Sequence, residues 1–206
     1  MSYRKYYEEW AENPLSFWDE KAKDISWIEL YKKTLHKTEN YYAWFYQGKL
    51  NTCYNCIDRH VENGKGEKVA IIYDSPITNT KIKITYSHLL KKVSSLAASL
   101  SNIGVKKGDT VILYMPMIPE VIVSMLACAR IGAIHSVVFG GFAAEELASR
   151  ISDVLPKVVI SASCGLEPKR IIDYKEILDK ALSLTSHKPL KQIIYQREQN
   201  LCKLIL

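Results

Sequence analysis

The residues best suited to bind a ligand form a turn with two adjacent glycines, Phe139-Gly140-Gly141-Phe142. An apolar, β-branched run precedes the turn, and a segment with early acidic residues and an apolar stripe follows it. This order predicts a strand at 133–138 that is covered on both faces, then a sharp corner and a helix. Glycine lets a ligand approach the backbone, and the open N–H groups of a helix start bind phosphate. The alternative is an ordinary corner in which glycine serves only the geometry of the turn.

A second group of charged residues, Glu167-Pro168-Lys169-Arg170, follows another predicted strand. Ligands of parallel sheets bind beyond the carboxyl ends of the strands. The loops that should gather there are 115–119, 139–142 and 161–170. Lys169 and Arg170 would then bring cations toward the two-glycine turn, so that an anion meets amides on one side and a forked guanidinium on the other. The alternative is that Arg170 is an ordinary surface arginine.

Other reactive side chains have simpler explanations. Cys53 and Cys56 have CxxC spacing, with His60 four residues on, but no thioredoxin-like corner or second ligand pair is visible nearby. We therefore predict partly buried cysteines and no metal site. His135 lies in an apolar strand and is expected in the core, and Asp58-Arg59-His60 is expected to form ion pairs. P-loop, GxGxxG, GxSxG and HExxH motifs are absent, so no catalytic residues are assigned.

Composition narrows the class of protein. The chain has 206 residues, of which 48% are hydrophobic and 24% charged, which is typical of a globular protein. The net charge is +6, but the basic residues are scattered, so we expect no nucleic-acid partner. The longest apolar stretch, 121–129, is too short to cross a bilayer, so no membrane partner is expected. The first residues lack the features of a signal or transit peptide, and the five cysteines suggest no disulfide framework, which together predict a cytoplasmic protein.

The chain divides into three parts by pattern. Residues 1–66 form an N-terminal cap segment with predicted helices at 3–13, 14–23 and 51–61 and an aromatic cluster at 41–46 that packs it onto a larger body. Residues 67–199 alternate between strands and helices, which predicts an α/β fold with a parallel sheet. Residues 200–206 form a separate tail. The predicted strands are 69–73, 81–86, 110–114, 133–138, 157–161 and 192–195, and the later helices are 87–104 with Ser87 as its cap, 120–130, 145–151 and 173–184.

Several motifs occur in one order along the chain from about Tyr6 to about Gln199. They are Asn13-Pro-Leu-Ser-Phe-Trp18, Trp44-Phe-Tyr-Gln-Gly-Lys-Leu-Asn51, Asn55-Cys-Ile-Asp-Arg-His60, Pro116-Met-Ile-Pro-Glu120 and Arg130-Ile-Gly-Ala-Ile-His-Ser-Val-Val-Phe-Gly-Gly-Phe142. In this order they resemble acetyl-CoA and propionyl-CoA synthetases, which are AMP-forming acyl-CoA ligases of the adenylating superfamily. The segments 163–170, 174–175 and 186–189 look closest to the propionyl-CoA synthetase branch.

The resemblance implies a two-step reaction and a place for CoA. A short carboxylate and MgATP form an acyl-adenylate and pyrophosphate, and the CoA thiol then gives acyl-CoA and AMP. Phe139, Gly140 and Gly141 match the family's turn at the nucleotide end of CoA, and Glu167-Pro168-Lys169-Arg170 matches the loop at its phosphates. Arg170 fits the family's arginine in that loop. Glu167 stands where the acetyl-CoA branch often has a second arginine.

The resemblance covers roughly the first third of the family's sequence. The loop for ATP phosphate, the carboxylate pocket, the adenine-binding motifs, the hinge and the C-terminal domain with the catalytic lysine have no counterpart here. The fold implied is therefore an incomplete N-terminal domain with an unpaired sheet edge, and the tail at 200–206 looks like a frameshift or premature stop.

These departures limit the activity that is expected. CoA is the expected ligand, ATP and Mg²⁺ are not expected to bind, and a ligase reaction would need a second chain. The alternatives are a non-catalytic CoA- or nucleotide-binding module, one half of a split enzyme, or a dinucleotide-dependent oxidoreductase. The last is disfavoured because its glycine fingerprint is absent.

Overall fold

The computed structural model describes residues 2–203. The chain divides into two compact units, Met1–Asn55 and Cys56–Leu206. The division lies inside the 51–65 segment that the sequence analysis assigned entirely to the cap, whose predicted boundary follows residue 66. Of the predicted tail, residues 204–206 lie outside the described part of the chain.

The first unit is built from two helices and a hairpin. Its elements are α1 (Tyr3–Glu12), α2 (Pro14–Ala22), β1 (Lys33–Lys37) and β2 (Tyr42–Tyr46). The Oδ1 of Asn13 accepts a hydrogen bond from the Ser16 amide at 3.1 Å, and Pro14 occupies the first turn, so the predicted start of α2 is confirmed. The hairpin was not predicted, because six consecutive aromatic or small residues hide the alternation that marks a strand.

The aromatic side chains of this unit pack on one another. The ring centroid of Phe45 lies 5.5 Å from that of Trp27 and 5.1 Å from that of Tyr31. Tyr31 also donates a hydrogen bond from its hydroxyl to Asp19 Oδ1 at 2.7 Å. This bond and a second from the Thr34 hydroxyl lower the pKa of Asp19 below its ordinary value. The aromatic cluster thus joins the hairpin to α2 within the unit.

The second unit contains a four-stranded parallel sheet in the part of the chain that is described. Its elements are η1 (Tyr54–Asp58, shared with the first unit), η2 (Val61–Lys65), β3 (Val69–Ser75), β4 (Thr80–Thr85), α3 (Tyr86–Asn102), β5 (Thr110–Tyr114), α4 (Pro119–Ile131), β6 (Ile134–Val138), α5 (Ala144–Val154), β7 (Val158–Ala162), β8 (Cys164–Glu167), β9 (Arg170–Asp173), α6 (Tyr174–Leu184) and β10 (Lys191–Tyr195). The sheet order is β10-β7-β5-β6, and each pairing is parallel. The predicted α/β fold is confirmed.

Local signals placed most helix ends correctly. Gly132 adopts a left-handed conformation at the end of α4, and the Asp173 carboxylate caps α6 by accepting from the Glu176 amide at 2.8 Å. The prediction that Ser87 caps α3 is wrong. Thr85 is the cap, because it is extended and its hydroxyl lies 3.3 Å from the His88 amide, whereas Ser87 is already helical.

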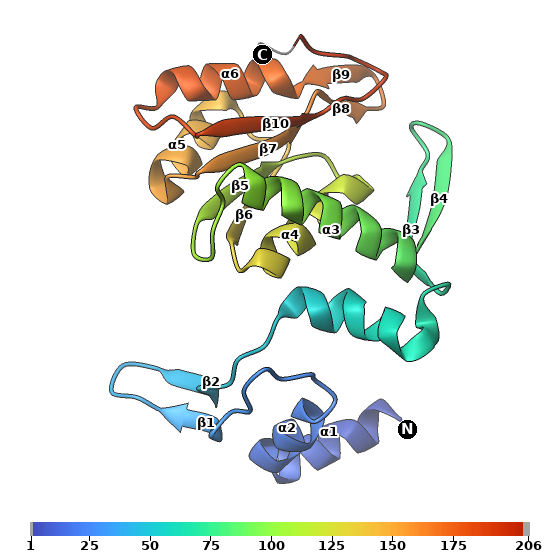
Figure 1. The fold of residues 1–206 in the computed structure, drawn as a ribbon, viewed down its shortest axis with the longest axis vertical. Helices are drawn as coiled ribbons and strands as arrows, with labels where there is room; N and C mark the ends of the chain where they lie inside the picture. The colour runs from blue at the N-terminus through green and yellow to red at the C-terminus, as the bar shows by residue number, and fades with distance from the viewer. Residues whose placement is uncertain (1, 204–206) are drawn as a thin grey trace. The chain divides into compact units, whose positions relative to one another are not determined.

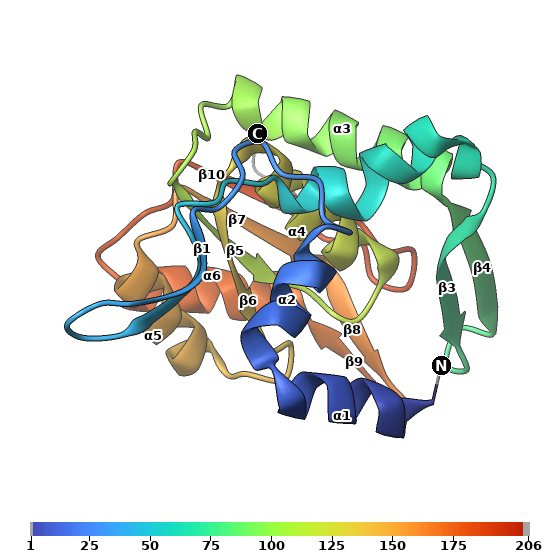
Figure 2. The same cartoon turned by 90° about the horizontal axis from the view of Figure 1, so that it is seen from below.

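Helices cover both faces of the sheet. Figures 1 and 2 show α3 and α4 on one side, with α5 and α6 on the other. The connection from β5 to β6 runs through α4, whereas the connection back to β7 runs through α5 and passes β5. The direction of winding therefore reverses between β5 and β7, which is the point where open α/β sheets bind ligands.

The strand that enters the two-glycine turn lies at the edge of the sheet. β6 pairs only with β5 within residues 2–203, and Ile134 and Val137 are 56% and 51% exposed. The prediction that this strand is covered on both faces is wrong. A short β-branched run has the same composition in a central strand and in an edge strand, so the sequence alone did not reveal the order of strands.

Candidate functional site

Three loops leave the sheet at the carboxyl ends of its parallel strands, as predicted. In the parallel register Tyr114 lies beside Val138 of β6 and beside Ser161 of β7. The segments after these strands, which include the two-glycine turn and the Glu167–Arg170 motif, therefore start at one level. The loops start at the same end of the sheet because the strands pair parallel, whatever the conformation of each loop.

The two-glycine turn presents open amides. The Phe142 amide donates to the Phe139 carbonyl at 3.0 Å and closes the turn. The amides of Gly140 and Gly141 donate no hydrogen bond to any group of residues 2–203. α5 follows with Ala143 at its N-cap position, and no side chain caps it. Open N–H groups at a helix start form an environment that suits an anionic oxygen, although Glu145 and Glu146 in the first turn of α5 oppose a negative ligand.

Crowding against a buried ring explains why residue 140 is a glycine, whereas residue 141 is crowded only by the ring of the exposed Phe139. Neither has a positive φ, so a left-handed backbone is not the reason. A Cβ on Gly140 would lie 2.1 Å from the Tyr174 hydroxyl oxygen, and one on Gly141 would lie 2.6 Å from Cε1 of Phe139. Both distances are shorter than a Cβ tolerates. A larger residue would therefore force either the turn or the aromatic side chain to move.

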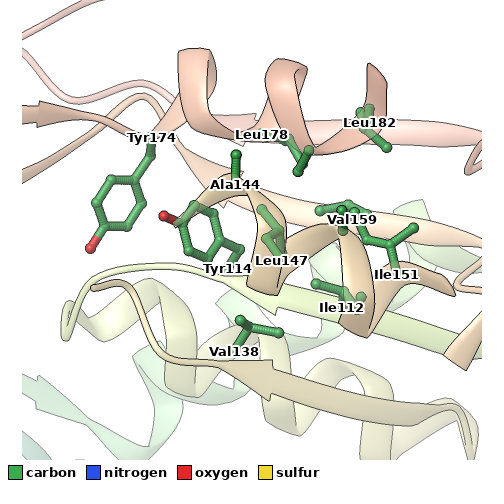
Figure 3. Close-up of a cluster of buried hydrophobic side chains, with 12 residues drawn as sticks. Ile112, Tyr114, Val138, Ala144, Leu147, Ile151, Val159, Tyr174, Leu178 and Leu182 are labelled. Carbon is green, nitrogen blue, oxygen red and sulfur yellow. The ribbon is translucent and has the colours of Figure 1, made fainter. Parts of the chain in front are cut away.

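Tyr174 joins the two-glycine turn to the segment after β7. Its ring stacks on that of Tyr114 with centroids 4.8 Å apart, and a Cβ on Gly165 of β8 would lie 2.4 Å from its Cε1. Tyr114 in turn donates from its hydroxyl to the Phe142 carbonyl at 3.1 Å. Figure 3 shows the two rings side by side at one end of the buried cluster between α5, α6 and the sheet. The two-glycine turn and Gly165 of β8, two residues before the Glu167–Arg170 motif, therefore contact one side chain.

Burial alters the acidity of both tyrosines. It raises the pKa of Tyr114 to about 12. Burial also raises the pKa of Tyr174, an effect that the nearby positive charge of Arg197 partly offsets. Both phenols are therefore protonated at neutral pH, and each is available as a hydrogen-bond donor.

The Glu167–Arg170 motif forms a hairpin instead of the predicted loop. β8 and β9 pair antiparallel, and Pro168 and Lys169 make the exposed turn between them. The Arg170 guanidinium binds the Glu167 carboxylate through Nε–Oε2 at 2.7 Å and Nη2–Oε1 at 3.3 Å. This bond lowers the pKa of Glu167. The loop prediction missed the hairpin because only four residues on each side pair.

The cross-strand pair changes the expected anion site. Arg170 is 69% exposed, so its guanidinium is accessible, but an anion must compete with the Glu167 carboxylate for its N–H groups. An exposed pair of this kind contributes little to stability. Its main effect is to reduce the positive potential at the hairpin, where the sequence analysis had assigned a free cation.

Arg197 also lies at the carboxyl ends of the strands, and it was not predicted from the sequence. Arg197 follows β10, and its Nη1 donates to the Cys164 carbonyl at 3.1 Å while its amide donates to Ser163 Oγ at 2.9 Å. It therefore holds the start of β8 and brings a positive charge near Tyr174. A charged residue two positions after the end of a parallel strand was the available signal.

The remaining reactive residues lie elsewhere in the chain. Cys53 is buried and Cys56 is exposed, and no group of three His, Cys, Asp or Glu residues that could hold a metal occurs among residues 2–203. Asp58 accepts two hydrogen bonds of 2.7 Å from Arg130, so the predicted ion pair is confirmed for this residue. His135 is half-buried, and burial lowers its pKa. None of the helices in the described residues is both long enough and apolar enough to traverse a bilayer.

Comparison with known families agrees with the resemblance. Residues 3–56 match the acetyl-coenzyme A synthetase N-terminus, and residues 57–202 match the AMP-binding enzyme family. The chain belongs to the AMP-binding enzyme family. Within this family it corresponds to the N-terminal portion of the short-chain acyl-CoA and acetyl-CoA synthetases.

Curated members of the family show how much of the protein is represented. The human acyl-CoA synthetase short-chain family member 3, mitochondrial, is 53% identical over 95% of this chain, which covers 29% of that protein. Acyl-CoA synthetase short-chain family member B, mitochondrial, from Dictyostelium discoideum is 46% identical over 96% of the chain and 29% of its own length. The acetyl-coenzyme A synthetase of Shewanella frigidimarina is 47% identical over 88% of the chain and 28% of its own length. The chain thus spans less than a third of these relatives.

The comparisons correct one prediction. The sequence analysis predicted a cytoplasmic protein, whereas the family member 3 relatives from human, orangutan and rat are mitochondrial proteins. The prediction of a cytoplasmic location is therefore wrong. The prediction of a cytoplasmic location rested on the absence of signal- or transit-peptide features in the first residues. The absence of these features is weak evidence about location.

Proposed function

We propose that this chain contributes the binding surface for the nucleotide end of CoA to an AMP-forming ligase of short carboxylic acids. Such a ligase would convert the carboxylate, ATP and CoA into acyl-CoA, AMP and pyrophosphate, with propionate as the preferred acid. Membership of the family supports the reaction type. The observation that carries the assignment to CoA is the contact of both the two-glycine turn and β8 with Tyr174.

The residues of the surface would act as follows. The open amides of Gly140 and Gly141 would donate to phosphate oxygens, and Phe139, which is 71% exposed, would offer its ring to the ligand. Arg170 would supply a forked cation from the β8–β9 hairpin, with Lys169 beside it in the turn. Pro168 would restrict the turn. No catalytic residue is assigned to this chain.

Glu167 would weaken this surface. Its carboxylate occupies the Arg170 guanidinium and carries a negative charge, so a phosphate must displace it and tolerate its proximity. The family's acetyl-CoA branch often has an arginine at this position. We therefore propose that the present chain binds CoA phosphate less tightly than a chain with a neutral or basic residue at 167.

Charge variants of the hairpin test the CoA site. In calorimetric titrations with CoA, Arg170→Ala should weaken binding by at least about tenfold, because a charge-assisted hydrogen bond contributes about 1.5–3 kcal/mol. Glu167→Gln should strengthen it, since the competing charge is removed. CoA should bind more tightly than dephospho-CoA if the surface contacts the 3′-phosphate, which dephospho-CoA lacks.

Arg4→Ala is the matched control. Arg4 also pairs with a glutamate in an exposed position, at 3.0 Å from Glu8, and its removal changes the net charge by the same amount. Binding that falls equally in Arg4→Ala and Arg170→Ala would indicate a general charge effect and would contradict a specific site. Absence of heat with millimolar CoA would refute the CoA assignment itself.

The chain alone is proposed to lack ligase activity. The ATP-phosphate loop and catalytic lysine of the family have no counterpart in this sequence, so pyrophosphate exchange into ATP with propionate should stay at the level of a blank. Exchange well above the blank would contradict this expectation. Exchange that appears only when a second chain supplies the remaining family sequence would identify one half of a split enzyme. The exposed Ile134 and Val137 favour that reading, because they lie on β6, one side of which has no partner strand within residues 2–203.

A further inference from the structure

Tyr174 is a buried phenol whose hydroxyl has no partner among residues 2–203. The side chain is only 5% exposed, and its ring is fixed by Tyr114 on one face and by Gly165 of β8. The hydroxyl of Tyr114 has a partner in the Phe142 carbonyl, whereas the hydroxyl oxygen of Tyr174 has none in the described chain and is not itself buried, so a ligand can reach it. The structure therefore contains a donor that is held in place but not used by the fold.

The hydroxyl lies directly beside the two-glycine turn. It lies so close to the turn that it would clash with a Cβ at residue 140, since the ideal Cβ of Gly140 would be 2.1 Å from its oxygen. In Figure 3 the hydroxyl of Tyr174 points away from the other labelled side chains of the cluster. The turn that this hydroxyl contacts at Gly140 also presents the amides of Gly140 and Gly141, which lack partners in the described chain.

We propose that the Tyr174 hydroxyl is a ligand-contacting group of the phosphate site, donating a hydrogen bond to an anionic oxygen that the Gly140 and Gly141 amides also hold. This inference depends on the proposed CoA site and adds a third donor to it. The hydroxyl comes from α6, so the site combines the β6 corner with the start of the helix that follows the β8–β9 hairpin. The Tyr174 hydroxyl is a neutral donor, so it can bind phosphate without forming an ion pair with Glu167. Arg170, in contrast, is already paired with that carboxylate.

The charged groups around the phenol support this role. Arg197 and Glu167 exert opposite effects on the pKa of Tyr174, and burial, which is the largest effect, raises it. The hydroxyl therefore keeps its proton throughout the neutral range. It remains a donor whatever the ionisation of the ligand phosphate.

Removing the hydroxyl alone tests the proposal. In calorimetry of the 206-residue chain with CoA and, separately, with inorganic pyrophosphate, Tyr174→Phe should weaken binding about tenfold, which corresponds to one hydrogen bond to a charged group. Its thermal midpoint should equal that of the unmodified chain, because the ring and its stacking on Tyr114 are kept. Tyr42→Phe, which removes an exposed hydroxyl in the first unit, is the control and should bind as the unmodified chain does.

The possible results separate the two proposals. Equal affinity of the unmodified chain and Tyr174→Phe would overturn the role of Tyr174 and leave the CoA site standing. A lower thermal midpoint in Tyr174→Phe would show that the hydroxyl serves the fold, which also overturns the inference. Failure of the unmodified chain to bind either ligand would overturn both proposals.

A spectroscopic measurement on the unmodified chain gives an independent check, with Tyr174→Phe used only to assign the signal. With tyrosines labelled at Cζ by ¹³C, the Tyr174 signal is the one that Tyr174→Phe removes. This signal should shift when CoA is added to the unmodified chain, because Cζ carries the hydroxyl that bonds the ligand. A Tyr174 signal that stays constant at saturating CoA would overturn the inference.

Discussion

Replacement of Tyr114 with alanine is expected to lower the free energy of unfolding by about 3–5 kcal/mol. Tyr114 is completely buried in β5, at the end of the cluster between the sheet, α5 and α6. Its removal would leave a cavity under Tyr174 and would also free the Phe142 carbonyl that its hydroxyl binds at 3.1 Å. Urea denaturation followed by circular dichroism measures this loss.

Tyr114→Phe is the control that separates ring packing from hydrogen bonding. It keeps the stacked ring and removes the bond to the Phe142 carbonyl together with a longer one of 3.5 Å to the Gly140 carbonyl, so it should cost about 0.5–1.5 kcal/mol. Equal losses in the alanine and phenylalanine variants would mean that the ring contributes nothing beyond its hydroxyl. That result would contradict the packing of the cluster.

Replacement of Gly140 with alanine is expected to lower the free energy of unfolding by about 1–3 kcal/mol through overpacking. The new Cβ would lie 2.1 Å from the Tyr174 hydroxyl oxygen and 2.9 Å from its Cζ, and the buried ring has little room to move. The backbone at residue 140 does not need a positive φ, so the loss would come from this contact and not from backbone strain. The same denaturation measurement applies.

A double-mutant cycle tests the cause of this loss. Tyr174→Phe removes the atom at 2.1 Å, so it should restore much of the stability that Gly140→Ala loses. Gly165→Ala is the matched control, because its Cβ would meet ring carbon Cε1 at 2.4 Å, an atom that phenylalanine retains. Rescue of both alanine variants by Tyr174→Phe, or of neither, would contradict the geometry described above.

The elements with long or repeated patterns could be predicted from the sequence. The stripe of Leu89, Val93, Ala97 and Leu100 on α3 is the buried face that its 3.6-residue spacing indicated. Alternation of strands and helices predicted the parallel sheet, and parallel pairing then placed the loops after β5, β6 and β7 at one edge. These predictions hold because they depend on local periodicity and on a general rule of handedness.

Short elements and pairings could not be predicted in the same way. β8 and β9 have four residues each, too few for a recognisable strand pattern in the sequence, although their pairing sets Glu167 opposite Arg170. The isolated glutamate and arginine appeared as separate charges in the sequence. Their neutralisation depends on the register of the hairpin, which is a matter of backbone pairing and leaves no periodic signal.

By itself, the sequence determined the family and the α/β class, because motifs and periodicity are properties of the chain's order, and it predicted the two segments of the candidate site. Only the tertiary structure decided that β6 lies at an edge, that Glu167 occupies Arg170, and that one tyrosine from α6 touches both Gly140 and Gly165. These facts depend on distances between residues that are far apart along the chain. Such distances arise from the order of strands and from packing, and neither is encoded in any single segment.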